Sequence, residues 1–108
     1  MSKHCVIFIS TGSKEEAEKV SQGLVEDKLA FCVSSIPKMQ STYYWEDKIH
    51  VDEEFLLIVK TRTDHYEAVE RWIKKNHSYE VPEIIALPIE QGLPAYLSSI
   101  DNWLEKKA

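Results

Sequence analysis

Histidine and carboxylate side chains gather at two places in the sequence where they could bind a divalent cation. At the first place, His77, Glu80 and Glu83 follow one another closely in a segment that enters a predicted strand. Imidazole nitrogens and carboxylate oxygens are both ligands of divalent metals. His77 also stands where a predicted helix ends, and a histidine there can bind the last helix carbonyls. The sequence leaves both interpretations open, a metal site at His77 or a helix cap.

The second place is a predicted strand that carries His50, Asp52 and Glu54. Successive side chains of a strand point to opposite faces, so these three residues share one face and could hold a cation together. A charged, solvated strand face that prevents the association of sheet edges explains the same pattern. We favour the solvated face.

The sequence contains no recognisable catalytic motif. Its three glycines do not form a phosphate-binding loop, and neither a GxSxG nor an HExxH pattern occurs. Cys5 and Cys32 stand inside apolar runs without CxxC spacing. They are expected to be buried, reduced thiols rather than disulfide partners or zinc ligands.

The composition predicts one globular domain over residues 1–108. Hydrophobic residues make up 44% of the chain, and 13 basic against 18 acidic side chains give a formal net charge of −5. A chain of this length can bury one core. Its acidity disfavours nucleic acid as a partner. No apolar stretch approaches the roughly 20 residues of a membrane span, and the first residues do not resemble a signal peptide, so we expect no membrane partner and a cytoplasmic location.

Hydrophobic periodicity predicts four strands and three helices in the order β-α-β-β-α-β-α. Short apolar runs indicate strands at 5–10, 31–36 and 84–89, and Pro37 interrupts the second strand before it resumes at 41–45. Pro88 suits an edge position in the last of these strands. A turn at 46–48, in which Asp47 tolerates a left-handed backbone, leads into a long third strand.

Capping residues delimit the predicted helices. Ser13 is expected to cap a helix over 14–29, with the Glu16 side chain reaching back to it. Thr63 or Asp64 is expected to cap the second helix, which ends near Asn76 and His77. A third helix begins at Pro94.

This element order predicts an α+β, ferredoxin-like (split βαβ) antiparallel sheet with a long hairpin between the second and third strands and an extra C-terminal helix. Right-handed crossovers place the first and third strands in the middle of the sheet. Both of these strands are apolar on both faces, at 6–9 and 55–59. The two crossover helices cover only one face, so a second copy of the chain is expected to cover the other. The hairpin of 41–54 offers strands to such a neighbour.

Several segments resemble the CutA divalent-cation tolerance proteins over essentially the whole chain. They are AFCV (30–33), YYWEDKI (43–49), KTR (60–62), YEVPEIIALPI (79–89), PAYL (94–97) and Trp103. The resemblance implies a ferredoxin-like subunit in a homotrimer that acts in the tolerance of divalent metals, copper being the ion usually named. Vertebrate relatives are also linked to the anchoring of an enzyme at membranes, so a structural trimerisation role is an alternative.

The resemblance also implies a copper site, made by a cysteine at the end of the first strand and two adjacent histidines near the end of the second helix. In this chain those positions hold Ser10, Asn76 and His77. Copper prefers thiolate and imidazole ligands, and only His77 supplies one. His77 is therefore the single metal-ligand candidate, for Cu2+ or another divalent cation.

In a trimer, one subunit's hairpin would lie over its neighbour's cleft, the natural place for a ligand. We predict that seven residues line this cleft: Tyr44, Trp45, Glu46, Lys60, Arg62, His77 and Glu83. The aromatic residues could instead pack the subunit interface. Lys60 and Arg62 could pair with Glu83 or Glu90, or bind an anion as in signalling trimers of the PII type.

The function predicted from the sequence is that of a non-catalytic trimeric protein that responds to divalent cations. A PII-like sensor of a small molecule or anion and a structural trimer are the alternatives. An acylphosphatase would need an arginine in the loop after the first strand, and the only arginines are Arg62 and Arg71.

Overall fold

The computed structural model describes residues 2–106 and has the predicted α+β, ferredoxin-like architecture. One antiparallel sheet has the strand order β2-β3-β1-β4, so the first and third strands are central, as predicted. The elements are β1 (His4–Thr11), α1 (Lys14–Glu26), β2 (Cys32–Trp45), β3 (Lys48–Arg62), a 3-10 turn η1 (Thr63–His65), α2 (Tyr66–Asn76), β4 (Ile84–Ile89) and α3 (Pro94–Glu105). Within residues 2–106, no helix is both long and apolar enough to span a bilayer.

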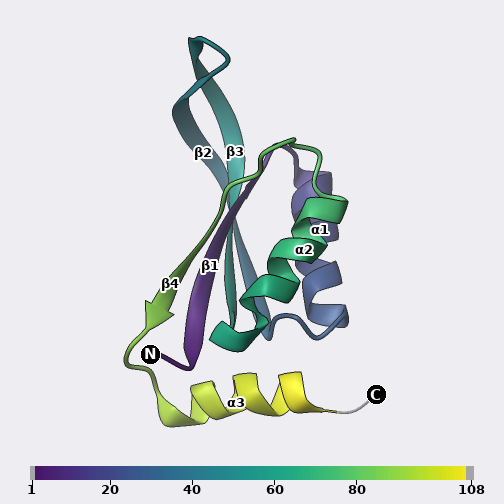
Figure 1. Ribbon diagram of the computed structural model, residues 1–108, viewed down its shortest axis with the longest axis vertical. Helices are drawn as coiled ribbons and strands as arrows, with labels where there is room; N and C mark the ends of the chain where they lie inside the picture. Colours follow the sequence, from purple (N-terminus) through teal and green to yellow (C-terminus); the bar gives the residue numbers. More distant parts are fainter. Residues whose placement is uncertain (1, 107–108) are drawn as a thin grey trace.

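Helices α1 and α2 cover one face of the sheet and enclose the core (Figure 1). Alternate residues of the central strands are fully buried against them, among them Ile7, Ile9, Leu57 and Val59. The two helices approach closely at Gly23, where an added Cβ would lie 2.4 Å from a ring carbon of Trp72. The indole therefore occupies the space that a side chain at position 23 would need.

Helix α1 begins as predicted but ends early. The Ser13 hydroxyl accepts the Glu16 N–H at 3.1 Å. The return bond from Glu16 is not made, because its carboxylate accepts the N–H and hydroxyl of Ser78 at 2.8 and 3.1 Å. The predicted end at residue 29 is wrong, since Lys28 has a φ of 55° and the chain leaves the helix after Glu26.

Strand β2 is continuous, so the predicted interruption at Pro37 is wrong. The register with β3 shifts between Ile36 and Met39, and Lys38 has a φ of 61°. This bulge absorbs the proline and lets pairing resume beyond it. At the hairpin tip, Glu46 and Asp47 both have positive φ, which is the two-residue turn that fits the strand twist and confirms the left-handed Asp47.

The start of α2 also differs from the prediction. Neither Thr63 nor Asp64 caps the helix, because η1 precedes it and no side-chain cap bond is made. The Thr63 hydroxyl donates to the Ser2 carbonyl at 2.8 Å, and the Asp64 carboxylate accepts from Arg62. The predicted end of α2 at Asn76 and the start of α3 at Pro94 are confirmed.

The sheet face turned away from α1 and α2, here called the outer face, is apolar and only partly covered. Helix α3 lies across its lower end (Figure 1), where Asp101 bonds to His4 at 2.9 Å. Above it, the strand register places apolar side chains side by side: Phe8 is paired with Ile58 and with Ile85. Ile85 is 51% exposed and Leu87 48% exposed.

Candidate functional site

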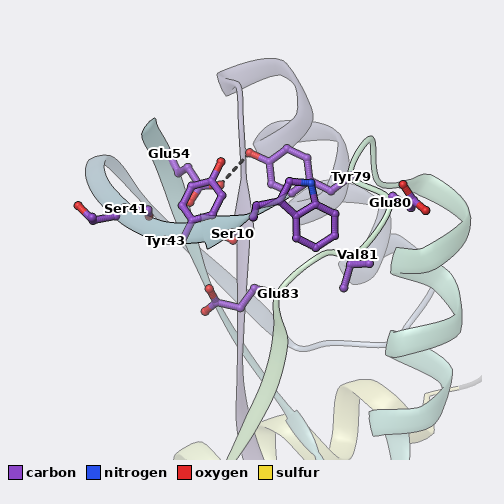
Figure 2. A pocket seen from close by; sticks show the side chains of 10 residues that line it. Ser10, Ser41, Tyr43, Glu54, Tyr79, Glu80, Val81 and Glu83 are labelled. Carbon is purple, nitrogen blue, oxygen red and sulfur yellow. Dashed lines mark hydrogen bonds between the residues drawn. The ribbon is translucent and has the colours of Figure 1, made fainter. Parts of the chain in front are cut away.

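A pocket of about 520 Å³ lies on the outer-face side, between the β2–β3 hairpin and the loop that joins α2 to β4 (Figure 2). The hairpin and β1 supply residues from one side, and the loop supplies residues from the other. The lining residues are Ser10, Ser41, Thr42, Tyr43, Trp45, Glu54, Tyr79, Glu80, Val81 and Glu83.

The buried carboxylate of Glu54 and the more exposed side chain of Tyr79 meet in the pocket. Glu54 is 6% exposed, and the Tyr79 hydroxyl donates to its Oε2 at 2.7 Å, the bond drawn as a dashed line in Figure 2. Burial raises the pKa of Tyr79 above its ordinary value, and the hydrogen bond to Glu54 and the charge of Glu54 raise it further. Tyr79 is therefore a stable hydrogen-bond donor rather than an acid in any physiological range.

Tyr43 forms the hairpin wall of the pocket. Its hydroxyl donates to the Asp52 carboxylate, and its ring stacks on His50 with centroids 5.3 Å apart. The bond to Asp52 is the main reason that the pKa of Tyr43 is raised. His50 also bonds to the Trp45 carbonyl at 3.1 Å. Of the three residues of the alternating pattern, His50 and Asp52 thus both contact Tyr43, whereas Glu54 faces Tyr79.

His77 holds the loop against β1 through both of its ring nitrogens. The Tyr79 N–H donates to Nδ1 at 3.0 Å, and Nε2 lies 2.8 Å from the Ser10 carbonyl. A backbone N–H can only donate and a carbonyl can only accept, so Nδ1 bears the lone pair and Nε2 bears the proton. The side chain is fully buried. A metal could bind this imidazole only if one of the two hydrogen bonds were broken.

The other two positions of the implied copper site have separate roles. Ser10 is 3% exposed and lines the pocket. The Asn76 amide donates to the Trp72 carbonyl on its own helix at 2.8 Å. Within residues 2–106, no three His, Cys, Asp or Glu side chains are arranged to hold a metal ion.

Lys60 and Arg62 lie at the far end of β3 from the pocket. Lys60 donates to the Ser34 hydroxyl at 2.5 Å. Arg62 binds Asp64 at 2.6 Å and Glu105 at 3.0 Å. The hydrogen bond from Arg62, followed by that from His65, lowers the pKa of Asp64 to about 2. Neither basic residue bonds to Glu83 or Glu90 within the described part of the chain.

Two of the seven predicted cleft residues, Trp45 and Glu83, line this pocket. Tyr44 and Glu46 are at the exposed hairpin tip, where the Tyr44 hydroxyl bonds to Asp47 at 3.2 Å. His77 lies next to the pocket residue Tyr79, with the centroids of the two rings 4.7 Å apart. One chain therefore does not bring the seven residues together, and the cleft between subunits stays a prediction.

The sequence reasoning missed Tyr79 as a pocket residue and Glu54 as its buried partner. One signal was present: Glu54 is the last charged residue before β3 becomes apolar on both faces, so it stands at the border of the core. The other signal was the glycine at position 12. It leaves room for Tyr79, because a Cβ added there would lie 2.8 Å from the Tyr79 oxygen.

Comparison with known proteins places this architecture in a family. A family model described as CutA1 divalent ion tolerance protein matches residues 5–106. This chain belongs to the CutA1 family. The divalent-cation tolerance protein CutA of Archaeoglobus fulgidus is 44% identical over 102 residues, which are 94% of this chain and 99% of that protein.

Solved CutA structures agree with the fold. The A. fulgidus protein, described as a periplasmic divalent cation tolerance protein, superposes with a TM-score of 0.92. CutA1 from Oryza sativa superposes with a TM-score of 0.93 at 37% identity, over 98% of this chain and 97% of that one. The chain spans about half the length of two plant relatives: 55% of the chloroplastic CutA 1 of Oryza sativa and 53% of the chloroplastic CutA of Arabidopsis thaliana, each 40% identical to it.

Proposed function

We propose that this protein is a non-catalytic homotrimer that acts in the tolerance of divalent cations, copper among them, as a binding module of the cytoplasm. The observation that carries the proposal is the outer face. Phe8, Ile58 and Ile85 lie side by side on it, and Ile85 is 51% exposed. An apolar strip of this kind is unusual on a monomer and typical of an interface between subunits.

The hairpin supports assembly in the same way. One of its faces presents Tyr44, Ile49 and Val51, and Ile49 is 67% exposed. These residues share a face because Tyr44 is paired with Ile49 and Thr42 with Val51. The hairpin extends beyond the rest of the sheet (Figure 1), which is the position from which it would reach a neighbouring subunit.

Light scattering on the purified protein tests the assembly. We expect a mass three times that of the 12.5 kDa chain and a melting temperature that rises with protein concentration. Ile58→Glu places a charge on the outer face and should dissociate the trimer or unfold it. Lys19→Glu, on the exposed side of α1, is the matched control and should leave the mass unchanged. A folded monomer at all concentrations would contradict the proposal.

Calorimetric titration with Cu2+ and Zn2+ tests direct cation binding by the assembled protein. Binding is expected to survive in His77→Gln, because both ring nitrogens already have hydrogen-bond partners in the folded chain. Binding that is lost in His77→Gln, with the trimer intact, would show instead that the imidazole gives up one of these bonds to a metal. Titrating inorganic phosphate into the same samples tests the PII-like alternative of an anion in a cleft between subunits.

The charge of the pocket favours a cation over an anion as its ligand. Three carboxylates and no basic side chain are among its lining residues. Lys60 and Arg62, the basic residues predicted for an anion site, are engaged elsewhere.

A further inference from the structure

The carboxylate of Glu54 is buried without an opposite charge. It accepts one hydrogen bond, from Tyr79, and forms no ion pair with any lysine, arginine or histidine of residues 2–106. Removing a charged carboxylate from water is costly unless a counter-charge and further hydrogen bonds compensate. Glu54 thus has the surroundings of a group whose cationic partner comes from outside the folded chain.

The walls around Glu54 determine which cation fits. Tyr43, Trp45 and Tyr79 supply aromatic rings, and Val81 adds an aliphatic surface. Glu83 turns its carboxylate toward the hairpin, whereas that of Glu80 turns away (Figure 2). An ammonium group is attracted both to carboxylates and to the faces of aromatic rings, and its carbon skeleton packs on apolar walls. A bare metal ion would use the carboxylates but not the rings.

We propose that this pocket binds a primary alkylammonium group joined to a small apolar or aromatic body, with Glu54 as its principal acceptor and Glu83 as a second. The volume of about 520 Å³ is sufficient for a small organic molecule. The proposal goes beyond the role in cation tolerance, because no metal ion takes part in it.

The alkylammonium group has two chemical sources, a free amine and a lysine side chain of a second copy of the chain. Both would place the same group against the same carboxylate. A free amine binds the assembled protein as a titratable ligand. A lysine of a second copy is present in every trimer and would be within bonding distance of Glu54 in the absence of any added ligand.

Calorimetry with phenethylammonium chloride tests the first source. Phenethyl alcohol and 3-phenylpropanoate are the matched probes, because they keep the ring and replace the cation by a neutral or an anionic group. We expect the amine to bind at least about tenfold more tightly than the alcohol, as a charge-assisted hydrogen bond predicts, and the carboxylate not to bind.

Glu54→Gln should weaken binding of the amine by a factor of about ten or more, since the amide still accepts the Tyr79 hydroxyl but has no charge. Glu53→Gln is the matched control, because Glu53 is the adjacent residue of β3, faces the other side and is exposed. Glu83→Gln gives a second test on an exposed side chain that the fold does not depend on. Circular dichroism and light scattering verify that each variant is folded and assembled.

Zero-length carbodiimide coupling followed by peptide mass spectrometry tests the second source. A cross-link between Glu54 and a lysine of a second copy, absent from Glu54→Gln, would support an alkylammonium supplied by the assembly. The proposal is overturned if phenethylammonium does not bind and Glu54 forms no such cross-link, or if the amine binds equally well to Glu54→Gln. Neither result depends on whether the protein binds copper, so the two proposals fail separately.

Discussion

The phenolic oxygen of Tyr79 occupies the space that a side chain at position 12 would need. A Cβ added to Gly12 would lie 2.8 Å from this oxygen, while the same hydroxyl donates to Glu54 at 2.7 Å. The tyrosine can reach its buried carboxylate only because residue 12 has no side chain. The loop after β1 therefore shapes the pocket without lining it.

Replacing Gly12 by alanine should break the bond between Tyr79 and Glu54. We expect the free energy of unfolding to fall by about 1–3 kcal/mol, because a buried carboxylate loses a hydrogen-bond donor. Denaturant unfolding measures the loss. In a Tyr79→Phe background the hydroxyl is absent, and the nearest ring carbons are 3.5 Å from the added Cβ. The same substitution should then be nearly neutral, and additive effects in this double-mutant cycle would contradict the contact.

A substitution at Gly23 should destabilise the protein although it improves helix propensity. Alanine in place of glycine inside a helix normally stabilises by about 1 kcal/mol. Here the new Cβ would lie 2.4 Å from a ring carbon of Trp72, so α1 and α2 must separate or the indole must move. We expect a net loss of about 1–3 kcal/mol, as found for overpacked cores, measured by denaturant unfolding. A gain in stability would show that the indole is free to move aside.

His77 is predicted to act as a structural residue of the loop. His77→Ala leaves the Ser10 carbonyl and the Tyr79 N–H without partners, and we expect a loss of about 2–4 kcal/mol in the free energy of unfolding. His65→Ala is the matched control, because among residues 2–106 the His65 ring bonds to its sequence neighbour Asp64 alone. Equal losses in the two variants would refute the structural role of His77.

Asp64 should make the stability depend on pH in the acid range. Its pKa is about 2 in the folded chain, against an ordinary value of 3.8. A carboxyl group whose pKa is lower in the folded state stabilises the protein at pH values above its ordinary pKa. This contribution is lost as the pH falls from about 3.8 to about 2. Asp64 is more than half exposed, so salt should reduce the effect.

Denaturation midpoints measured between pH 5 and pH 2 test this prediction, because they report how the free energy of unfolding changes as Asp64 is protonated. Asp64→Asn should be less stable than the wild type at neutral pH and should lose less stability on acidification. Glu67→Gln is a suitable control, since the Glu67 carboxylate has no hydrogen bond or ion pair in the described part of the chain. Parallel pH profiles for wild type and Asp64→Asn would contradict the prediction.

The order of elements and the central strands were predictable because they depend on local patterns. The apolar runs of β1 and β3, Ser13 before α1 and Pro94 at the start of α3 each indicate an element without reference to the rest of the chain. The predictions that proved wrong also depended on local patterns. Considered without its partner strand, a proline at position 37 predicts a break in β2. In the sheet, β3 pairs with β2 on both sides of Pro37, and a bulge accommodates the proline.

The site was less predictable because its contacts join distant parts of the sequence. Tyr79 meets Glu54 from the opposite side of the pocket, and Glu16 bonds to Ser78 instead of capping its own helix. A single sequence contains no sign of such pairs beyond the presence of a polar residue beside an apolar run. The partner of a buried polar side chain is determined by tertiary packing, which periodicity does not describe.

The pairing of β1 with β4 has a consequence for the order in which the chain can fold. The β2–β3 hairpin joins residues near in sequence, such as Trp45 and Lys48, whereas one edge of β1 is completed only when His4 meets Ile89. Contacts between distant residues carry the larger entropic cost of loop closure and form slowly. During synthesis, the hairpin can therefore form on the emerging chain, while the edge of β1 stays open until nearly the whole protein has left the ribosome.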